Sequence, residues 1–153
     1  MDDAMLRKNL VELLEGGNAY APIDKVLAGI KAQNRHVRPA GAPHSVWEEL
    51  QHMRIAQEDI LRYSLDENWQ SPPWPDAAGK PSKAEWNAAT KGFFKDLKEL
   101  KSIVRGRKID LTATIPHGEG RTYLRQVLLA ADHNAYHAGQ IVVIRRLLKD
   151  WPV

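Results

Sequence analysis

The sequence predicts an all-α protein, a four-helix bundle with long connecting loops and one short extra helix. Apolar residues recur every three or four positions in four long segments, which is the period of an amphipathic helix. Two of these segments open with a capping box, and the alternating pattern of strands is nearly absent. A chain of 153 residues suits a single domain, 1–153, whose core needs no disulfides.

The first predicted helix runs from Asp3 to Glu15. Gly16-Gly17 ends it, because glycine adopts the left-handed cap conformation at no steric cost. A short helix is expected after Pro22, and prolines and a glycine between Gln33 and Pro43 indicate a loop. The apolar positions of these two helices are Leu6, Leu10, Leu13, Leu14, Ile23, Val26, Leu27 and Ile30.

The next two long helices begin at capping boxes, Ser45-Val46-Trp47-Glu48 and Ser82-Lys83-Ala84-Glu85. In each box the serine hydroxyl accepts an amide hydrogen bond of the first turn, and the glutamate returns to the serine amide. The first of these helices is expected to end near Leu65. The two apolar stripes consist of Val46, Leu50, Met53, Ile60 and Leu61, and of Trp86, Ala89, Phe93, Leu97, Leu100 and Val104.

Four prolines exclude a continuous helix between Asp66 and Pro81. Two tryptophans there favour a loop packed on the bundle over an interdomain linker. Residues 105–120 are irregular, and 111–115 alternate weakly, as a short extended piece would. The last long helix runs from about Thr122 to Leu148 and is apolar nearly all round in its middle, which predicts burial. Connections of this length suggest one crossover between bundle ends.

Composition limits the possible functions. The chain has no cysteine, so a transition-metal site must use histidine and carboxylate, which suits zinc, nickel, iron or manganese. The net charge is only +3, and the basic residues are interleaved with acidic ones. Both features argue against nucleic-acid binding. The acidic start and the short apolar runs predict a cytoplasmic protein that binds no membrane.

Two of the six histidines, His133 and His137, lie four residues apart and share one face of the last helix. The ring nitrogens of two adjacent buried histidines are difficult to pair with side chains alone. A metal ion solves this, because one nitrogen of each neutral ring donates its lone pair to the ion. The pair therefore favours a metal site. The same face carries Gln126, Leu129, Ala130, Gln140, Ile144 and Leu147.

A solvent-facing polar strip and a pair of core histidines are the alternatives, because two histidines at this spacing often occur on helix surfaces. Leu129, Ile144 and Leu147 on the same face argue against the strip. Gln126 and Gln140 flank the pair and are candidates to support ligands or contact a substrate. Ala130 is small and leaves space near an ion.

A third ligand must come from another helix. His52 lies at the edge of the apolar stripe that follows Ser45, and the residues alone leave two interpretations open, a ligand and a half-exposed boundary histidine. His44 is expected to cap a helix or lie at the surface. His36 and His117 fall in predicted loops and are expected to be exposed, with His117 a candidate for the mouth of a site.

Two segments resemble the motifs of the DinB/YfiT-like superfamily. Residues 44–61 resemble its second-helix motif and residues 132–140 its last-helix motif, and the similarity covers essentially the whole chain. The resemblance implies a four-helix bundle with a divalent metal on three histidines, which match His52, His133 and His137. Zinc or nickel is expected first, and iron, manganese or cobalt next.

The resemblance also implies a homodimer and a small-molecule substrate, for which a low-molecular-weight thiol is a candidate. Three imidazoles leave coordination positions open, so a metal-dependent hydrolase and a thiol-dependent transferase are both compatible. A non-catalytic metal-binding or stress-related dimeric bundle is the alternative. The sequence identifies no catalytic residue. Glu48, Glu49 and Asp59 are candidate bases but are expected to be exposed helix-surface carboxylates.

Overall fold

The computed structural model describes residues 2–73, 77 and 79–152. Its α-helices are α1 (Asp3–Glu15), α2 (Ile23–Leu27), α3 (Val46–Leu65), α4 (Lys83–Arg105) and α5 (Tyr123–Leu147), and a 3-10 turn spans Ala32–Asn34. Within these described residues, the extended piece expected at 111–115 is reduced to one bridge between Thr114 and Thr122. The all-α prediction is therefore confirmed. None of these helices combines the length and apolar character needed to span a bilayer.

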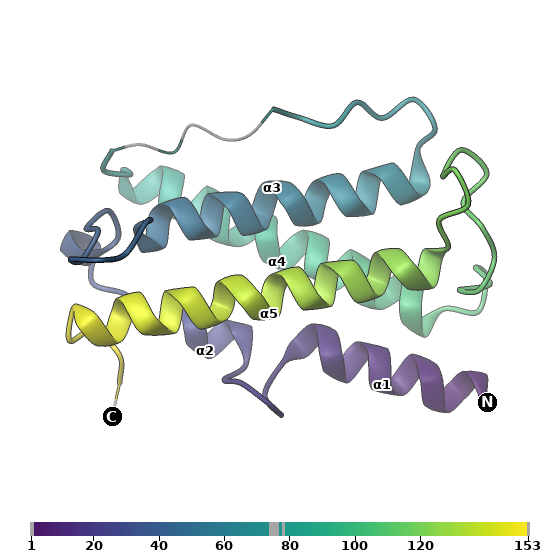
Figure 1. Ribbon diagram of the computed structural model, residues 1–153, viewed down its shortest axis with the longest axis horizontal. Coiled ribbons are helices and arrows are strands. Elements are labelled where there is room, and N and C mark those ends of the chain that lie inside the picture. The colour runs from purple at the N-terminus through teal and green to yellow at the C-terminus, as the bar shows by residue number, and fades with distance from the viewer. Residues whose placement is uncertain (1, 74–76, 78, 153) are drawn as a thin grey trace.

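The four long helices pack as a bundle in which α3 and α1 each contact both α4 and α5. In Figure 1, α3 and α4 run in one direction and α1 and α5 in the other, so the chain returns along the bundle between α3 and α4. This return is the expected crossover. α1 covers only part of the length of α5, and α2 packs against α5 further along.

Local hydrogen bonds explain where the long helices begin. Both predicted capping boxes are present, with the Ser45 and Ser82 amides donating to their glutamates at 2.8 Å. The hydroxyl of Thr122 accepts from the amide of Arg125 at 3.1 Å and starts α5. Each cap satisfies an amide that has no partner inside its helix. α1 ends at Gly16, whose φ of 72° is the left-handed conformation that glycine adopts freely.

The core confirms the predicted stripes of α3 and α4, which are buried along their whole length. Two predictions are wrong at the outer surface. Leu13 of α1 is 45% exposed, and Leu128 and Leu147 of α5 are 43% and 55% exposed. α5 is therefore not buried all round. One strip of it faces outward, because its neighbours α1 and α3 cover only its other sides.

Two buried arginines fix the ends of neighbouring helices. Arg7 of α1 donates to the carbonyl oxygens of Val104 and Gly106 at the end of α4, at 3.0 and 2.6 Å. Arg145 of α5 donates to the carbonyl oxygen of Val26 in α2 at 2.7 Å. Carbonyl groups at helix ends lack partners within their own helix, so each guanidinium satisfies acceptors and ties two elements together.

Among its described residues, the segment after α3 is mostly exposed and contacts α3 through the side chain of Trp69. Nε1 of Trp69 donates to a carboxylate oxygen of Asp59 on α3 at 2.8 Å. The other tryptophan of that segment, Trp74, lies outside the described residues. Asp59 therefore holds the loop.

Candidate metal centre

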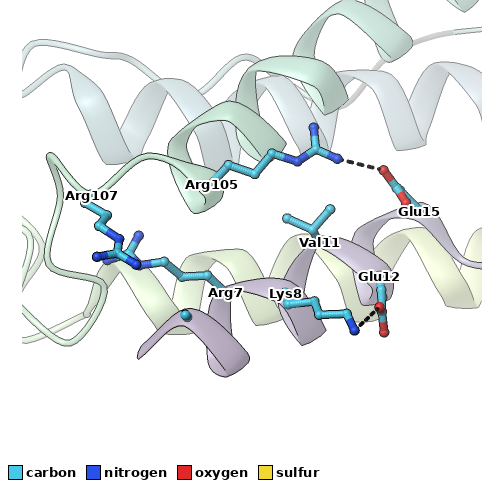
Figure 2. Close-up of a pocket in the computed structure, with 8 residues that line it drawn as sticks. Arg7, Lys8, Val11, Glu12, Glu15, Arg105 and Arg107 are labelled. Atoms are coloured by element: carbon cyan, nitrogen blue, oxygen red, sulfur yellow. Dashed lines mark hydrogen bonds and ion pairs between the residues drawn. The ribbon is translucent and has the colours of Figure 1, made fainter. Parts of the chain in front are cut away.

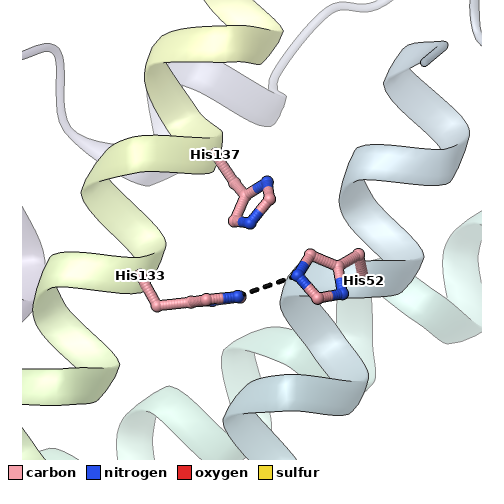
Figure 3. A group of neighbouring side chains, drawn as sticks. All are labelled: His52, His133 and His137. Carbon is pink, nitrogen blue, oxygen red and sulfur yellow. Dashed lines mark hydrogen bonds between the residues drawn. The ribbon is translucent and has the colours of Figure 1, made fainter. Parts of the chain in front are cut away.

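Three histidines from two helices converge in the contact between α3 and α5. His52 projects from α3, and His133 and His137 project from α5 (Figure 3). One ring nitrogen of each lies within 4.8 Å of those of the other two. Nε2 of His133 lies 2.9 Å from Nε2 of His52. No other group of histidines and carboxylates among the described residues meets this spacing.

The sequence positions these side chains through helix geometry. His133 and His137 are one turn apart on α5, so both point toward the same neighbour. His52 precedes the fully buried Met53 and lies at the boundary between the core and the surface. Because α3 packs directly against α5, this boundary position brings His52 onto the pair. The structure therefore brings His52, a boundary residue, into the cluster, and its role as a metal ligand stays a prediction.

Electrostatics keep two of the three rings neutral. Burial, followed by the charge of neighbouring His137, lowers the pKa of His52 to about 4. Burial and the same neighbour lower the pKa of His133 to about 4. At neutral pH both rings therefore carry a nitrogen lone pair, the form that binds metal ions. Among the described residues, the buried Nδ1 of His133 has no hydrogen-bond partner.

A buried carboxylate completes the surroundings of the cluster. The side chain of Glu49 is 3% exposed, and its Oε2 accepts a hydrogen bond from Nδ1 of His137 at 2.5 Å. Its Oε1 accepts from Nδ1 of His44 at 2.9 Å. Burial alone would raise the pKa of Glu49, but these hydrogen bonds outweigh burial and lower it.

The expectation that Glu49 is an exposed surface carboxylate is wrong. Glu49 lies three residues before His52, and residues at this spacing share one face of a helix. The face that points His52 toward α5 therefore also points Glu49 there. This spacing was the signal in the sequence that identifies Glu49 as part of the site.

Two of the other candidate polar residues, Glu48 and Gln126, have partners outside the cluster. Glu48 takes part in the cap of α3 and pairs with Arg38. Gln126 is buried and accepts from Arg125 at 2.6 Å. Gln140 is half-buried. A role for Gln126 or Gln140 at the site remains a prediction.

The remaining histidines lie outside the cluster. His117 is half-buried, and its Nε2 donates to the carbonyl oxygen of Tyr63 in the last turn of α3 at 2.6 Å. Tyr63 follows His52 by eleven residues, about 16 Å along the helix, so His117 supports the end of α3 and does not line the site. His36 is also half-buried, against expectation. His44 lies at the surface as expected, with 45% of its side chain exposed.

A separate pocket of about 450 Å³ lies between α1 and the end of α4 (Figure 2). Its charged groups mostly have partners within the chain. Lys8 pairs with Glu12 at 3.9 Å, and Arg105 pairs with Glu15 at 3.2 Å. Arg7 donates hydrogen bonds to the carbonyl groups at the end of α4. The pocket is therefore a surface groove stabilised by ion pairs, and the histidine cluster remains the candidate site.

The residues of the cluster fit a divalent metal ion. Because Glu49 accepts a hydrogen bond from Nδ1 of His137, the neutral form of this ring holds its proton on Nδ1 and offers the lone pair of Nε2 to a metal ion. Neutral imidazoles are good ligands for zinc, nickel, iron and cobalt. Three imidazoles also leave at least one coordination position open, which is typical of catalytic rather than structural sites.

Comparison with known families finds a match over the part of the chain that contains the histidine cluster. A family model described as the DinB superfamily matches residues 18–141, a range that contains all three histidines. No curated protein and no solved structure matches the chain.

Proposed function

The chain belongs to the DinB superfamily, and on that premise we propose that it binds one divalent metal ion through His52, His133 and His137. The convergence of one ring nitrogen from each of the three carries this proposal. Zinc or nickel suits the imidazole set best, with iron, manganese or cobalt as further possibilities. The protein is expected to act in the cytoplasm on a small molecule.

We propose further that the site is catalytic, with hydrolysis and transfer of a low-molecular-weight thiol as the two reaction classes. A bound metal would supply Lewis acidity, which lowers the pKa of a ligated water or thiol. The three histidines are partly exposed, His137 with 12% of its side chain, so we expect a small substrate to approach the cluster from solvent. Glu49 holds His137 and His44, and its oxygens are not available as a general base.

Metal titration of the purified protein tests the site. Wild type is expected to bind one Zn²⁺ per chain, and His133→Ala to bind it about 100-fold more weakly or worse, a loss of about 2.7 kcal/mol. His36→Ala is the matched control, because this histidine lies outside the cluster. A His133→Ala variant with the metal content of wild type would overturn the proposal.

A turnover screen separates catalysis from the alternative, a non-catalytic metal-binding bundle. Ester, amide and thiol-transfer substrates are compared with zinc- and nickel-loaded wild type and with the loaded protein after chelation. Turnover that disappears on chelation and is absent in His133→Ala supports the enzyme. Inactivity of the loaded protein across all three substrate classes supports the binding module.

We also propose that the protein is a homodimer and that α5 forms its interface. Asp132, Gly139 and Arg146 share one exposed side of α5, at seven-residue spacing. In an antiparallel pair centred on Gly139, Asp132 of each copy faces Arg146 of the other, which gives two opposite-charge contacts. Four exposed apolar side chains lie on or beside this strip, namely Leu128, Tyr136, Val143 and Leu147.

Analytical ultracentrifugation tests this interface by charge exchange. Asp132→Arg is expected to shift the protein toward monomer, and Asp132→Arg combined with Arg146→Asp to restore the dimer, because the pair is inverted but kept. A wild type that sediments as a monomer at all concentrations contradicts the homodimer. A dimer that Asp132→Arg leaves intact contradicts this interface.

A further inference from the structure

The carboxylate of Glu49 connects the histidine cluster to the protein surface. It lies on α3, opposite His137 of α5, and its side chain is 3% exposed. A buried carboxylate requires hydrogen-bond donors for both of its oxygens. Glu49 has one donor on each oxygen, and each of these donors is a histidine.

The inner hydrogen bond determines which nitrogen of His137 faces the cluster. A neutral imidazole carries its proton on either Nδ1 or Nε2, and the partner of one nitrogen selects the form. Nδ1 of His137 lies 2.5 Å from Oε2 of Glu49, and a carboxylate accepts but does not donate. The neutral form of His137 therefore holds its proton on Nδ1 and keeps the lone pair on Nε2.

The outer hydrogen bond holds the carboxylate itself. Nδ1 of His44 lies 2.9 Å from Oε1 of Glu49, and the His44 side chain is 45% exposed. A carboxylate held at both oxygens cannot rotate freely to approach the cluster as a ligand. The hydrogen bonds run in the order His44, Glu49 and His137, and Glu49 is the most buried of the three.

We propose that Glu49 is a positioning residue of the metal centre, which fixes the tautomer and ring orientation of His137, with His44 holding its carboxylate from the solvent side. This inference rests on the metal site proposed above. The competing explanation is an anchor that only joins α3 to α5. The two differ in whether the protonation form of His137 and the metal affinity depend on Glu49.

Nitrogen NMR of histidine-labelled protein, prepared without metal, reads the tautomer of His137 directly. Wild type is expected to carry the proton on Nδ1. Glu49→Leu removes the acceptor at similar volume, and His137 is expected to lose this single form. Glu49→Gln is the conservative variant, because its amide oxygen still accepts from His137, and it is expected to retain the Nδ1–H form.

Zinc titration of the same variants measures the consequence. Glu49→Leu is expected to weaken binding about 10- to 100-fold, as loss of the partner of a metal-bound histidine does. Glu49→Gln is expected to recover most of that loss, and His44→Ala to weaken binding only a few-fold. Glu48→Gln is the matched control, because the neighbouring carboxylate pairs with Arg38 away from the cluster.

The outcomes distinguish this inference from the proposed function. A Glu49→Leu variant that melts earlier but keeps the wild-type zinc affinity and His137 tautomer makes Glu49 a structural anchor and overturns the inference, while the metal site stands. Unchanged zinc affinity in His44→Ala overturns the role of His44. The metal site itself is tested separately by metal titration of His133→Ala, and a variant with the metal content of wild type would overturn it.

Discussion

Two polar clusters interrupt the apolar contact between α3 and α5, and they are built differently. One is the histidine cluster, His52, His133 and His137. The other, called the amide bridge here, joins Asn134 to Gln57, which is fully buried. Nδ2 of Asn134 donates to Oε1 of Gln57 at 2.8 Å, and Nε2 of Gln57 donates to the carbonyl oxygen of Phe93 on α4 at 2.8 Å.

The difference lies in how the polar groups meet. In the amide bridge the Asn134 and Gln57 amides meet as donor and acceptor and join three helices, while Oδ1 of Asn134 is buried without a partner among the described residues. In the histidine cluster three ring nitrogens converge within 4.8 Å, and the Nε2 atoms of His52 and His133 lie 2.9 Å apart, where one neutral ring donates to the other. The amide bridge joins its groups in pairs, whereas the histidine cluster directs three potential metal ligands at one point. The first arrangement suits a structural role, and the second suits a metal ion.

The largest expected effect is on zinc affinity, which should depend on the histidine cluster and not on the amide bridge. His52→Ala is expected to weaken zinc binding about 100-fold or more, equivalent to about 2.7 kcal/mol. It should change the stability of the metal-free protein by less than about 1 kcal/mol, because a half-buried boundary side chain is removed. Calorimetric titration and urea unfolding measure the two quantities. A variant that unfolds much more easily but still binds zinc would reverse the assignment of this cluster.

The amide bridge should respond in the opposite way. Gln57→Ala removes two buried hydrogen bonds and leaves a cavity, so we expect a loss of about 2–3 kcal/mol in the free energy of unfolding. Zinc affinity should change by less than about threefold, because Gln57 donates to Phe93 and accepts from Asn134. Loss of zinc binding in a folded Gln57→Ala protein would show that the two clusters act as one.

The smallest effect concerns Glu48, which neighbours Glu49 but belongs to neither cluster. Burial alone would raise the pKa of Glu48, but hydrogen bonds from Arg38 and Ser45 outweigh it and lower the pKa to about 2. Glu48→Gln is expected to cost only about 1 kcal/mol at pH 7, because the Arg38 partner is half exposed and screened by solvent.

The pH dependence of this difference has a definite sign. A carboxylate whose folded pKa lies below its unfolded value stabilises the protein above the unfolded value, here 4.5. The difference between wild type and Glu48→Gln should therefore be constant above pH 4.5 and disappear as the pH falls through about 2. Urea unfolding at several pH values checks this. A difference that grows on acidification contradicts the assigned ion pair.

The sequence predicted most of the fold because local signals and the apolar period agreed. The serines at 45 and 82 start α3 and α4 as expected, and their apolar stripes are buried. The exposure of Leu128 was missed because the period of one helix does not show which of its sides another helix covers. That choice depends on contacts between segments distant in the chain.

The residues of the site also differ in how far the sequence predicts them, because some depend on contacts between distant segments. His133 and His137 share a face within one helix, so their spacing was sufficient. His52 needed the packing of α3 on α5, and before that its placement depended on family resemblance. Glu49 is expected at the surface because carboxylates on helices are usually exposed, although its spacing of three from His52 places it on the face that meets its partner His137 of α5.

X-ray absorption spectroscopy of the zinc-loaded protein tests the three-histidine site most directly. The account predicts a signal from three imidazoles with zinc–nitrogen distances of about 2.0–2.1 Å, completed by a light atom at the open position. His133→Ala should remove one imidazole from that signal. A spectrum with fewer than three imidazoles, or with a carboxylate such as Glu49 bound to zinc in wild type, would contradict the account.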